Sequence, residues 1–339
     1  MRSLTLTAVG RLELADQPIP EPRPGEALVR MRAVGICGSD LHAYAHGRPG
    51  MEPPLVLGHE CAGEVVAVGP AVDPDLVGVA AAVVPTVACG NCPYCWRGES
   101  NICPNRLIVG LSLPGGLAEY VRVPARNLVP LPDGFPWPRA GVVEPVAVAV
   151  HLFDRLLRGL PGPTIVLGAG FLGLVCLQLA RLAGAPAVAV SDVQPHRLER
   201  ARALGADAVV NAREASPVAA LRRAVGGEGA ALVVDAAGVT ATRRQAVDLA
   251  RPGGTVGLLG LTDVESPLDF VQVVRKELLL VASYAATPLD FTRAVGLMAS
   301  GSLEVDHLLR AYPLAVAPEV FERLASGADI VKAVVQPDR

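Results

Sequence analysis

The feature that most constrains the fold is a glycine-rich turn between an apolar strand and an apolar helix. A strand expected at 164–168 runs into Gly168, Gly170 and Gly173, which have the spacing G-x-G-x-x-G. In such a turn the first glycine permits the tight bend, the second lets the backbone approach a pyrophosphate, and the third lets the helix pack closely on the strand. The glycines alone also fit a purely structural turn, so the choice between a nucleotide-binding turn and a structural one depends on the sequence around them.

The sequence around the turn alternates between short apolar strands and helical stretches, for example 171–183 and 196–204. This alternation predicts a parallel, doubly wound α/β sheet, the Rossmann type, over residues 147–284. The expected strands are 164–168, 187–191, 208–210, 231–235, 254–259 and 278–283. The N-terminus of the helix after the glycines then offers free N–H groups to phosphates. The predicted cofactor-binding residues in this turn are Gly168, Gly170, Phe171, Leu172 and Gly173.

An acidic residue at the end of the second strand bears on the choice of cofactor. Asp192 follows Gly173 by nineteen residues, the position from which a carboxylate accepts hydrogen bonds from an adenosine ribose. The same charge would repel a 2′-phosphate, which favours NAD over NADP. Arg197 lies just beyond the strand and could instead pair with such a phosphate, or be a solvated helix residue.

The rest of the chain has a different sequence pattern. Residues 1–146 read as β-rich, with expected strands at 3–9, 26–34, 62–68, 79–85 and 117–123 between stretches rich in Pro and Gly. After 285 we expect helices at 288–300 and 317–325 and a last strand at 330–335. We assign this tail, 285–339, to the first domain, so that the nucleotide-type domain is inserted within it.

Four cysteines are the strongest metal signal. The spacing C-x2-C-x2-C-x7-C suits four thiolates that close a tetrahedral structural zinc site, formed by Cys89, Cys92, Cys95 and Cys103. An iron–sulfur cluster is the alternative, but the ferredoxin pattern has a last gap of three residues rather than seven. Cys61 and Cys176 are expected to be ordinary buried cysteines.

A second set of ligand types is dispersed along the chain. Cys37 opens the run Cys-Gly-Ser-Asp-Leu-His, which we expect in a loop after a strand, and His59 and Glu60 follow. Glu144 is a lone carboxylate in an apolar segment, which is costly unless the group is paired or binds a metal. A catalytic zinc needs about three protein ligands and an open position. Cys37 and His59, with Glu60 or Glu144, could supply them.

These motifs together resemble the zinc-dependent medium-chain dehydrogenases/reductases, the superfamily of alcohol, polyol and threonine dehydrogenases. The resemblance covers essentially the whole chain and implies a GroES-like β-barrel catalytic domain beside the Rossmann domain. Its motifs are Cys37-Gly38-Ser39-Asp40-Leu41-His42, Gly58-His59-Glu60, the four cysteines, Gly116-Leu117-Ala118-Glu119-Tyr120, Glu144-Pro145, the glycine turn and Arg251-Pro252-Gly253-Gly254.

The resemblance also implies roles for individual residues. Cys37 and His59 would bind the catalytic zinc, with Glu60 and Glu144 as its carboxylates. Asp40 would orient His59, and Ser39 and His42 would form a proton relay. The implied reaction moves hydride between NAD and a secondary alcohol or polyol through a zinc-bound alkoxide.

The substrate remains open among several classes. The glutamates at the third-ligand position and Gly47-Arg48-Pro49-Gly50 favour polyol and threonine dehydrogenases. An L-threonine 3-dehydrogenase and an aminocyclitol dehydrogenase are alternatives, and a non-enzymatic structural relative that binds zinc and cofactor is a remote one. Family precedent suggests a homotetramer, or a homodimer joined through edge strands near 254–284.

Composition excludes other classes of protein. The formal net charge of −3 gives no electrostatic reason to expect a nucleic acid or anionic membrane partner. No apolar run approaches the ~20 residues of a membrane span. The N-terminus lacks the apolar stretch of a signal peptide, so we expect a cytoplasmic protein whose partner is a small-molecule alcohol.

Overall fold

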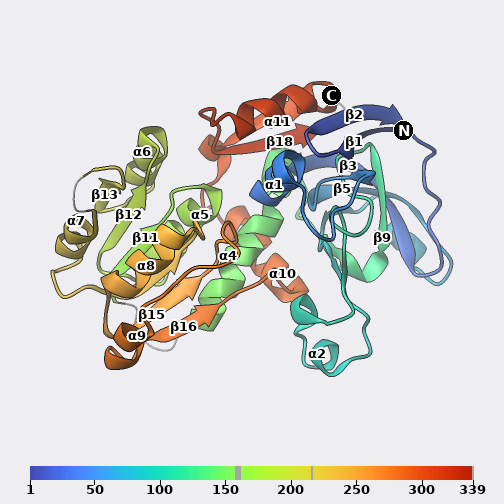
Figure 1. Ribbon diagram of the computed structural model, residues 1–339. Helices are drawn as coiled ribbons and strands as arrows, with labels where there is room; N and C mark the ends of the chain where they lie inside the picture. Colours follow the sequence, from blue (N-terminus) through green and yellow to red (C-terminus); the bar gives the residue numbers. More distant parts are fainter. Residues whose placement is uncertain (157–161, 215–216, 338–339) are drawn as a thin grey trace. The chain divides into compact units, whose positions relative to one another are not determined.

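A computed structural model describes residues 1–156, 162–214 and 217–337 (Figure 1). The chain forms two compact units. The first comprises Met1–Ala147 and Ala285–Arg339, and the second comprises Val148–Tyr284. The sequence boundaries proposed above, 146/147 and 284/285, fall within one residue of these limits.

The second unit contains a six-stranded parallel sheet in the order β13-β12-β11-β14-β15-β16. This is the strand order of dinucleotide-binding folds, with the order reversing between β11 and β14. Its strands are β11 (Thr164–Leu167), β12 (Val188–Asp192), β13 (Ala208–Asn211), β14 (Ala230–Asp235), β15 (Ala250–Leu258) and β16 (Leu279–Ala282). The predicted doubly wound sheet is therefore confirmed.

Helices connect these strands, as parallel crossovers require. They are α5 (Phe171–Leu182), α6 (Pro195–Ala203), α7 (Pro217–Ala224), α8 (Thr240–Leu249) and α9 (Phe270–Arg275). All of β11 and all of β12 are buried, which explains their nearly continuous apolar sequence, since helices cover both faces of a parallel sheet.

The first unit is β-rich, and its main sheet has the order β10-β6-β5-β3-β18-β17, with β9 also paired to β3. Its strands are β3 (Glu26–Gly35), β5 (Glu60–Val68), β6 (Ala80–Val83), β9 (Tyr120–Pro124), β10 (Leu128–Pro130), β17 (Leu309–Pro313) and β18 (Lys332–Gln336). Because β18 pairs antiparallel with β3, with Val335 opposite Val34, the C-terminal tail completes this sheet.

Smaller sheets and helices surround the main sheet of the first unit. The short strands are β1 (Arg2–Ala8), β2 (Arg11–Asp16), β4 (Leu55–Val56), β7 (Thr86–Val87) and β8 (Leu107–Ile108). The helices are α1 (Gly38–His46), α2 (Pro93–Trp96), α3 (Trp137–Ala140), α4 (Val143–Leu156), which continues into the second unit, α10 (Pro288–Ala299) and α11 (Ala317–Ala325). Strands β2 and β17 were not anticipated from the sequence.

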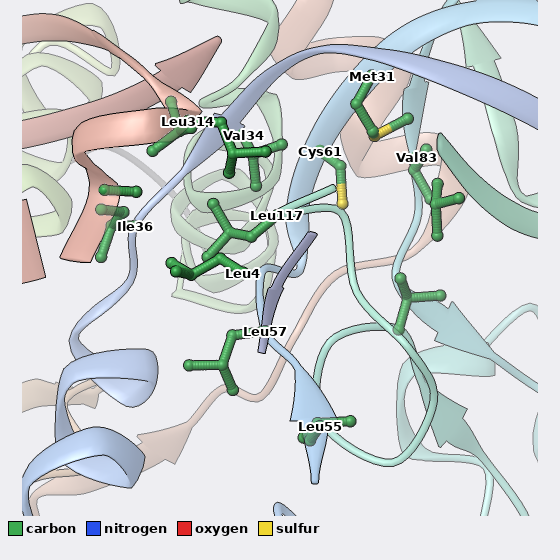
Figure 2. Close-up of a cluster of buried hydrophobic side chains, with 14 of the residues drawn as sticks. Leu4, Met31, Val34, Ile36, Leu55, Leu57, Cys61, Val83, Leu117 and Leu314 are labelled. Atoms are coloured by element: carbon green, nitrogen blue, oxygen red, sulfur yellow. The ribbon is translucent and has the colours of Figure 1, made fainter. Parts of the chain in front are cut away.

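The apolar core of the first unit anchors the segments that lead into α1 and β5. Leu4, Leu57 and Leu117 are fully buried and lie close together in Figure 2. The Cys61 side chain lies in the same apolar cluster, near Met31. Burial raises the pKa of the Cys61 thiol to about 12, which keeps it a neutral thiol, as expected of an ordinary core cysteine.

One expectation about local structure was wrong. The run after Cys37 is not a loop, because Gly38–His46 forms helix α1 and Cys37 is its N-cap residue. The carboxylate of Asp40, the third helical residue, accepts the Cys37 backbone N–H at 2.9 Å, which satisfies one of the free donors at a helix start. The sequence interpretation overlooked this capping pattern.

Candidate metal and nucleotide sites

The four cysteines of residues 89–103 converge to one point. The sulfur–sulfur distances are 3.5 Å for Cys92–Cys95 and Cys89–Cys103, 3.8 Å for Cys92–Cys103 and 4.0 Å for Cys89–Cys95. A tetrahedron with Zn–S bonds of about 2.3 Å has edges of about 3.8 Å. A disulfide would need about 2.05 Å. The thiols therefore have the spacing of a closed tetrathiolate zinc site.

A second group of ligand types forms elsewhere in the first unit. Cys37, His59 and Glu60 each offer a ligand atom, and these atoms lie within 4.8 Å of one another. Cys37 comes from the start of α1, while Glu60 is the first residue of β5 and His59 precedes it. Thiolate, imidazole and carboxylate are the donors that zinc takes in sites with an open position.

The orientation of His59 is set by Asp40. Asp40 is fully buried, and its Oδ1 lies 3.5 Å from His59 Nδ1. This contact directs the Nδ1 side of the ring to the carboxylate and leaves Nε2 for another partner. Carboxylates commonly orient metal-binding histidines in this way. Asp40 thus links the helix cap to the orientation of the ring.

The electrostatics of this group suit a cation. Burial by itself lowers the pKa of His59, but the negative charges of Asp40 and Cys37 outweigh burial and raise the pKa well above its usual value. Surroundings that favour a proton on the imidazole also favour a divalent cation beside it. Thiolate, imidazole and carboxylate donors within 4.8 Å of one another are those that zinc takes, so the donor set fits a zinc ion.

Glu144 lies near this group but outside the close trio. It is in the first turn of α4, and burial raises the pKa of its carboxyl to about 7, against the opposing effect of His59. The charge of Glu60 also raises the pKa of Glu144, and the charge of Lys332 lowers it. Glu144 is therefore within electrostatic range of the ligand trio. Glu60, not Glu144, completes the close trio with Cys37 and His59.

The sequence interpretation missed a charged residue that contacts this group. Lys332, the first residue of β18, is 5% exposed. Its Nζ lies 2.6 Å from Glu60 Oε1 and 2.5 Å from Glu60 Oε2. Only Lys276 and Lys332 are lysines in a chain with 30 basic residues. A rare lysine within an apolar strand was the available signal, since a buried ammonium needs a partner.

The two residues proposed for a proton relay lie on one face of α1. Ser39 and His42 are three residues apart, so their side chains are neighbours on the helix. The Ser39 Oγ is 3.5 Å from His59 Nε2, while His42 is exposed. Ser39 therefore lies beside the ligand trio, and His42 lies at the surface of the same helix.

The glycine turn in the second unit has the conformation expected for phosphate binding. Gly168 has φ +96°, a region that favours glycine. A Cβ on Gly173 would lie 1.8 Å from the Gly168 carbonyl oxygen, whereas Gly170, the N-cap of α5, has open space where its Cβ would be. Phe171 and Leu172 begin α5. The helix start is thus open at Gly170 and tightly packed at Gly173.

Asp192 lies at the end of β12, next to this turn. Its Oδ2 accepts the Ala169 N–H at 2.7 Å and its Oδ1 accepts the Gln194 N–H at 2.8 Å. Arg197 Nη1 lies 3.8 Å from Asp192 Oδ2. The carboxylate is therefore tied to the glycine turn, and the arginine beside it lies near that carboxylate.

Comparisons with known proteins identify the family of this chain. Residues 23–133 match the family described as "Alcohol dehydrogenase GroES-like domain", and residues 172–300 match "Zinc-binding dehydrogenase". The chain is 35% identical to L-galactonate-5-dehydrogenase of Escherichia coli over 94% of this chain and 93% of that protein. It is 36% identical to L-threonine 3-dehydrogenase of Thermococcus kodakarensis over 88% and 86%.

A solved structure shares the whole architecture. A zinc-binding dehydrogenase from Sinorhizobium meliloti, bound to NADP, has a TM-score of 0.92 and 35% identity, covering 99% of each chain. Fold and ligand groups together define a zinc-dependent, nucleotide-binding oxidoreductase that acts on CH–OH groups. The chain belongs to the zinc-binding medium-chain dehydrogenase family, with polyol and threonine dehydrogenases among its relatives.

The structure also bears on membrane association. No α-helix within the described residues combines the length and apolar character required to span a bilayer.

Proposed function

We propose that this enzyme oxidises a secondary hydroxyl of a small polyhydroxylated substrate, with NAD as the hydride acceptor. The observation that carries the proposal is the convergence of Cys37, His59 and Glu60 in a chain whose relatives are named for sugar-acid and threonine dehydrogenation. Both names imply a secondary hydroxyl flanked by other polar groups. A site with a carboxylate among its ligands and polar residues along α1 suits such substrates.

The roles of the chain's own residues follow from their positions. Cys37, His59 and Glu60 would hold the zinc, with Glu144 as a further carboxylate for it, and Cys89, Cys92, Cys95 and Cys103 would hold the structural zinc. When bound at the first site, zinc supplies a Lewis acid that lowers the pKa of an alcohol. Asp40 fixes the His59 ring. Ser39 would accept the substrate proton while it gives up its own hydroxyl proton towards His42, which would pass a proton to solvent.

The substrate proposal can be tested by following NADH formation. A screen should compare polyols and sugar acids with L-threonine, cyclitols and simple secondary alcohols. We expect the largest kcat/KM with a polyhydroxylated substrate. A clear preference for L-threonine would replace the proposed substrate class with the amino-alcohol alternative, which the similarity to threonine dehydrogenases makes the second candidate.

We propose NAD rather than NADP because Asp192 places a negative charge beside the phosphate-binding turn. Asp192→Ala should raise the ratio of kcat/KM with NADP to that with NAD by about tenfold or more, corresponding to at least ~1.4 kcal/mol of lost repulsion. Arg197→Ala is the matched variant, and it should lower that ratio. A wild-type enzyme active with NADP alone, the cofactor bound in the Sinorhizobium meliloti relative, would contradict the role of Asp192.

We propose a homotetramer, because each unit exposes several large apolar side chains that are close together in sequence. At the β16 edge of the second unit, the exposed side chains are Leu261, Val264, Phe270, Val271, Val274 and Leu279. On the cysteine lobe of the first unit they are Tyr94, Trp96, Ile102 and Leu107. Exposed patches of this kind mark protein interfaces, and two separate self-complementary interfaces generate a tetramer with D2 symmetry.

Light scattering after size-exclusion chromatography tests this assembly. Val274→Glu and Trp96→Glu should each reduce the tetramer to a dimer, because a buried unpaired charge is costly in either interface. The double variant should be a monomer. A monomeric wild-type protein would refute the proposed assembly without affecting the proposed reaction.

A further inference from the structure

Two exposed histidines lie one turn apart on helix α1. His42 and His46 are both at the surface, and their ring centroids are 5.2 Å apart. Residues separated by four positions are neighbours on one face of a helix, so the two imidazoles share one solvent-facing side of α1. The proton relay proposed above uses His42 but gives His46 no task.

The separation of the two rings suits a shared metal ion. With Zn–N bonds of about 2.1 Å and ring centres about 1.15 Å behind the nitrogens, two imidazoles at a tetrahedral angle have centroids about 5.3 Å apart. A right angle between the two bonds would bring the centroids to about 4.6 Å. The observed 5.2 Å agrees with the tetrahedral value. Histidines four positions apart are also the pair through which a single helix supplies two zinc ligands in metalloproteases.

The position of the pair on the helix also favours a cation. His46 is the last residue of α1, a helix of nine residues. The backbone carbonyls at this end carry the negative end of the helix dipole, which attracts positive charge. Imidazole is the commonest metal ligand among side chains, and solvent can fill the remaining coordination positions of an ion at an exposed site. Geometry and helix dipole therefore favour the same kind of ligand.

We propose that His42 and His46 chelate a further divalent transition-metal ion on the surface of α1. Zinc, copper and nickel are the ions that imidazole ligands suit, whereas Mg²⁺ and Ca²⁺ require oxygen ligands. The site shares no residue with the trio of Cys37, His59 and Glu60 or with the four lobe cysteines. It therefore binds its ion in addition to the two zinc ions proposed above.

Occupation of this site should slow the enzyme. A ring nitrogen that binds a metal ion can neither accept nor release a proton, so the ion withdraws His42 from the relay. Zinc in excess of the two ions already bound then acts as an inhibitor. This consequence rests on the proposed function, whereas the metal site itself does not.

Binding is tested by calorimetric titration of Zn²⁺ into enzyme that already holds two zinc ions per chain. The wild type should take up one further ion per chain, and Mg²⁺ should not compete for it. His46→Gln should weaken this binding at least about tenfold, because a single imidazole loses the advantage of a second linked ligand. His307→Gln is the matched control, since His307 is also exposed but lies in the short helix Asp306–Leu308, and it should bind zinc as the wild type does.

Turnover at the same zinc concentrations tests the consequence. Excess zinc should slow the wild type and His307→Gln by about the factor by which His42→Gln slows the enzyme at that pH. His46→Gln should be as active as the wild type without added zinc and should keep that activity at concentrations that inhibit the wild type. His42→Gln should not be slowed further, because it has already lost both the relay group and a ligand.

The proposal has clear ways to fail. A wild-type enzyme that takes up no further ion, or a His46→Gln variant that binds it equally well, would overturn the metal site. Binding without any loss of turnover would overturn the inhibition, and with it the place of His42 in the relay. Failure of the proposed catalytic zinc site would look different, because the enzyme would then hold only the lobe zinc before any is added.

Discussion

The two metal-ligand groups of this chain differ in almost every physical respect. The lobe group takes four identical thiols from fifteen consecutive residues, three of them partly exposed. Sulfur–sulfur distances of 3.5–4.0 Å leave no side of the tetrahedron open. Such a site cross-links its own loop and leaves no position for a substrate.

The other group takes three different donors from two elements, and charged residues surround it. Asp40 contacts Nδ1 of His59, and Lys332 forms an ion pair with Glu60. Glu144 lies near these residues, and burial raises the pKa of its carboxyl. The difference teaches that the spacing of its cysteines is enough to define a closed site, whereas a mixed site also needs neighbours that keep its ligands oriented.

The largest expected effect is loss of turnover when a ligand of the mixed group is removed. His59→Ala and Cys37→Ala should each lower kcat/KM on the order of 10³-fold or more, because a Lewis acid contributes several kcal/mol to such a reaction. Metal analysis should find one zinc per chain, held by the lobe. Cys176→Ala removes a buried cysteine outside both groups and should keep two. Full activity in either ligand variant would remove this group from the mechanism.

A smaller effect on turnover is expected at the lobe. Cys103→Ala should lose the lobe zinc and expose residues 89–103 to proteolysis, since a structural zinc site holds its loop together. The fall in kcat/KM should be less than about tenfold at low temperature, because no lobe residue contacts the reacting atoms in the proposed mechanism. The measurements are zinc content, limited proteolysis and kinetics on one sample. If activity disappears while the other zinc remains, the contrast between the groups is wrong.

The features that could be predicted from the sequence are those whose contacts are local, as in the lobe group. The lobe cysteines and the glycine turn were predictable because their ligands or contacts lie within fifteen residues, so that spacing alone restricts the geometry. The alternation of strands and helices after residue 147 likewise predicted the parallel sheet, and the strand order confirmed it. Local pattern was sufficient wherever the determining contacts were local.

Long-range contacts account for what was missed. Lys332 meets Glu60 across 272 residues of sequence, and this pairing arises only when β18 joins β3 in the sheet. Strand β17 was missed for a similar reason, because it pairs with β18 at the edge of that sheet. The helix after Cys37 was a different error, since Asp40 caps it locally and the capping residues are only three positions apart in the sequence.

The smallest effect concerns the path of the proton, which should change while both zinc ions stay in place. His42→Gln should slow turnover about tenfold at low pH and less at high pH, because release of a proton to solvent is hardest when solvent protons are abundant and water can replace an exposed relay group in part. His46→Gln is the control, since it lies on the same helix with its ring 5.2 Å from that of His42 but outside the proposed path from Ser39. Its pH profile should match that of the wild type. Equal slowing in the two variants, or none in either, would mean that the proton leaves by a route that does not use α1.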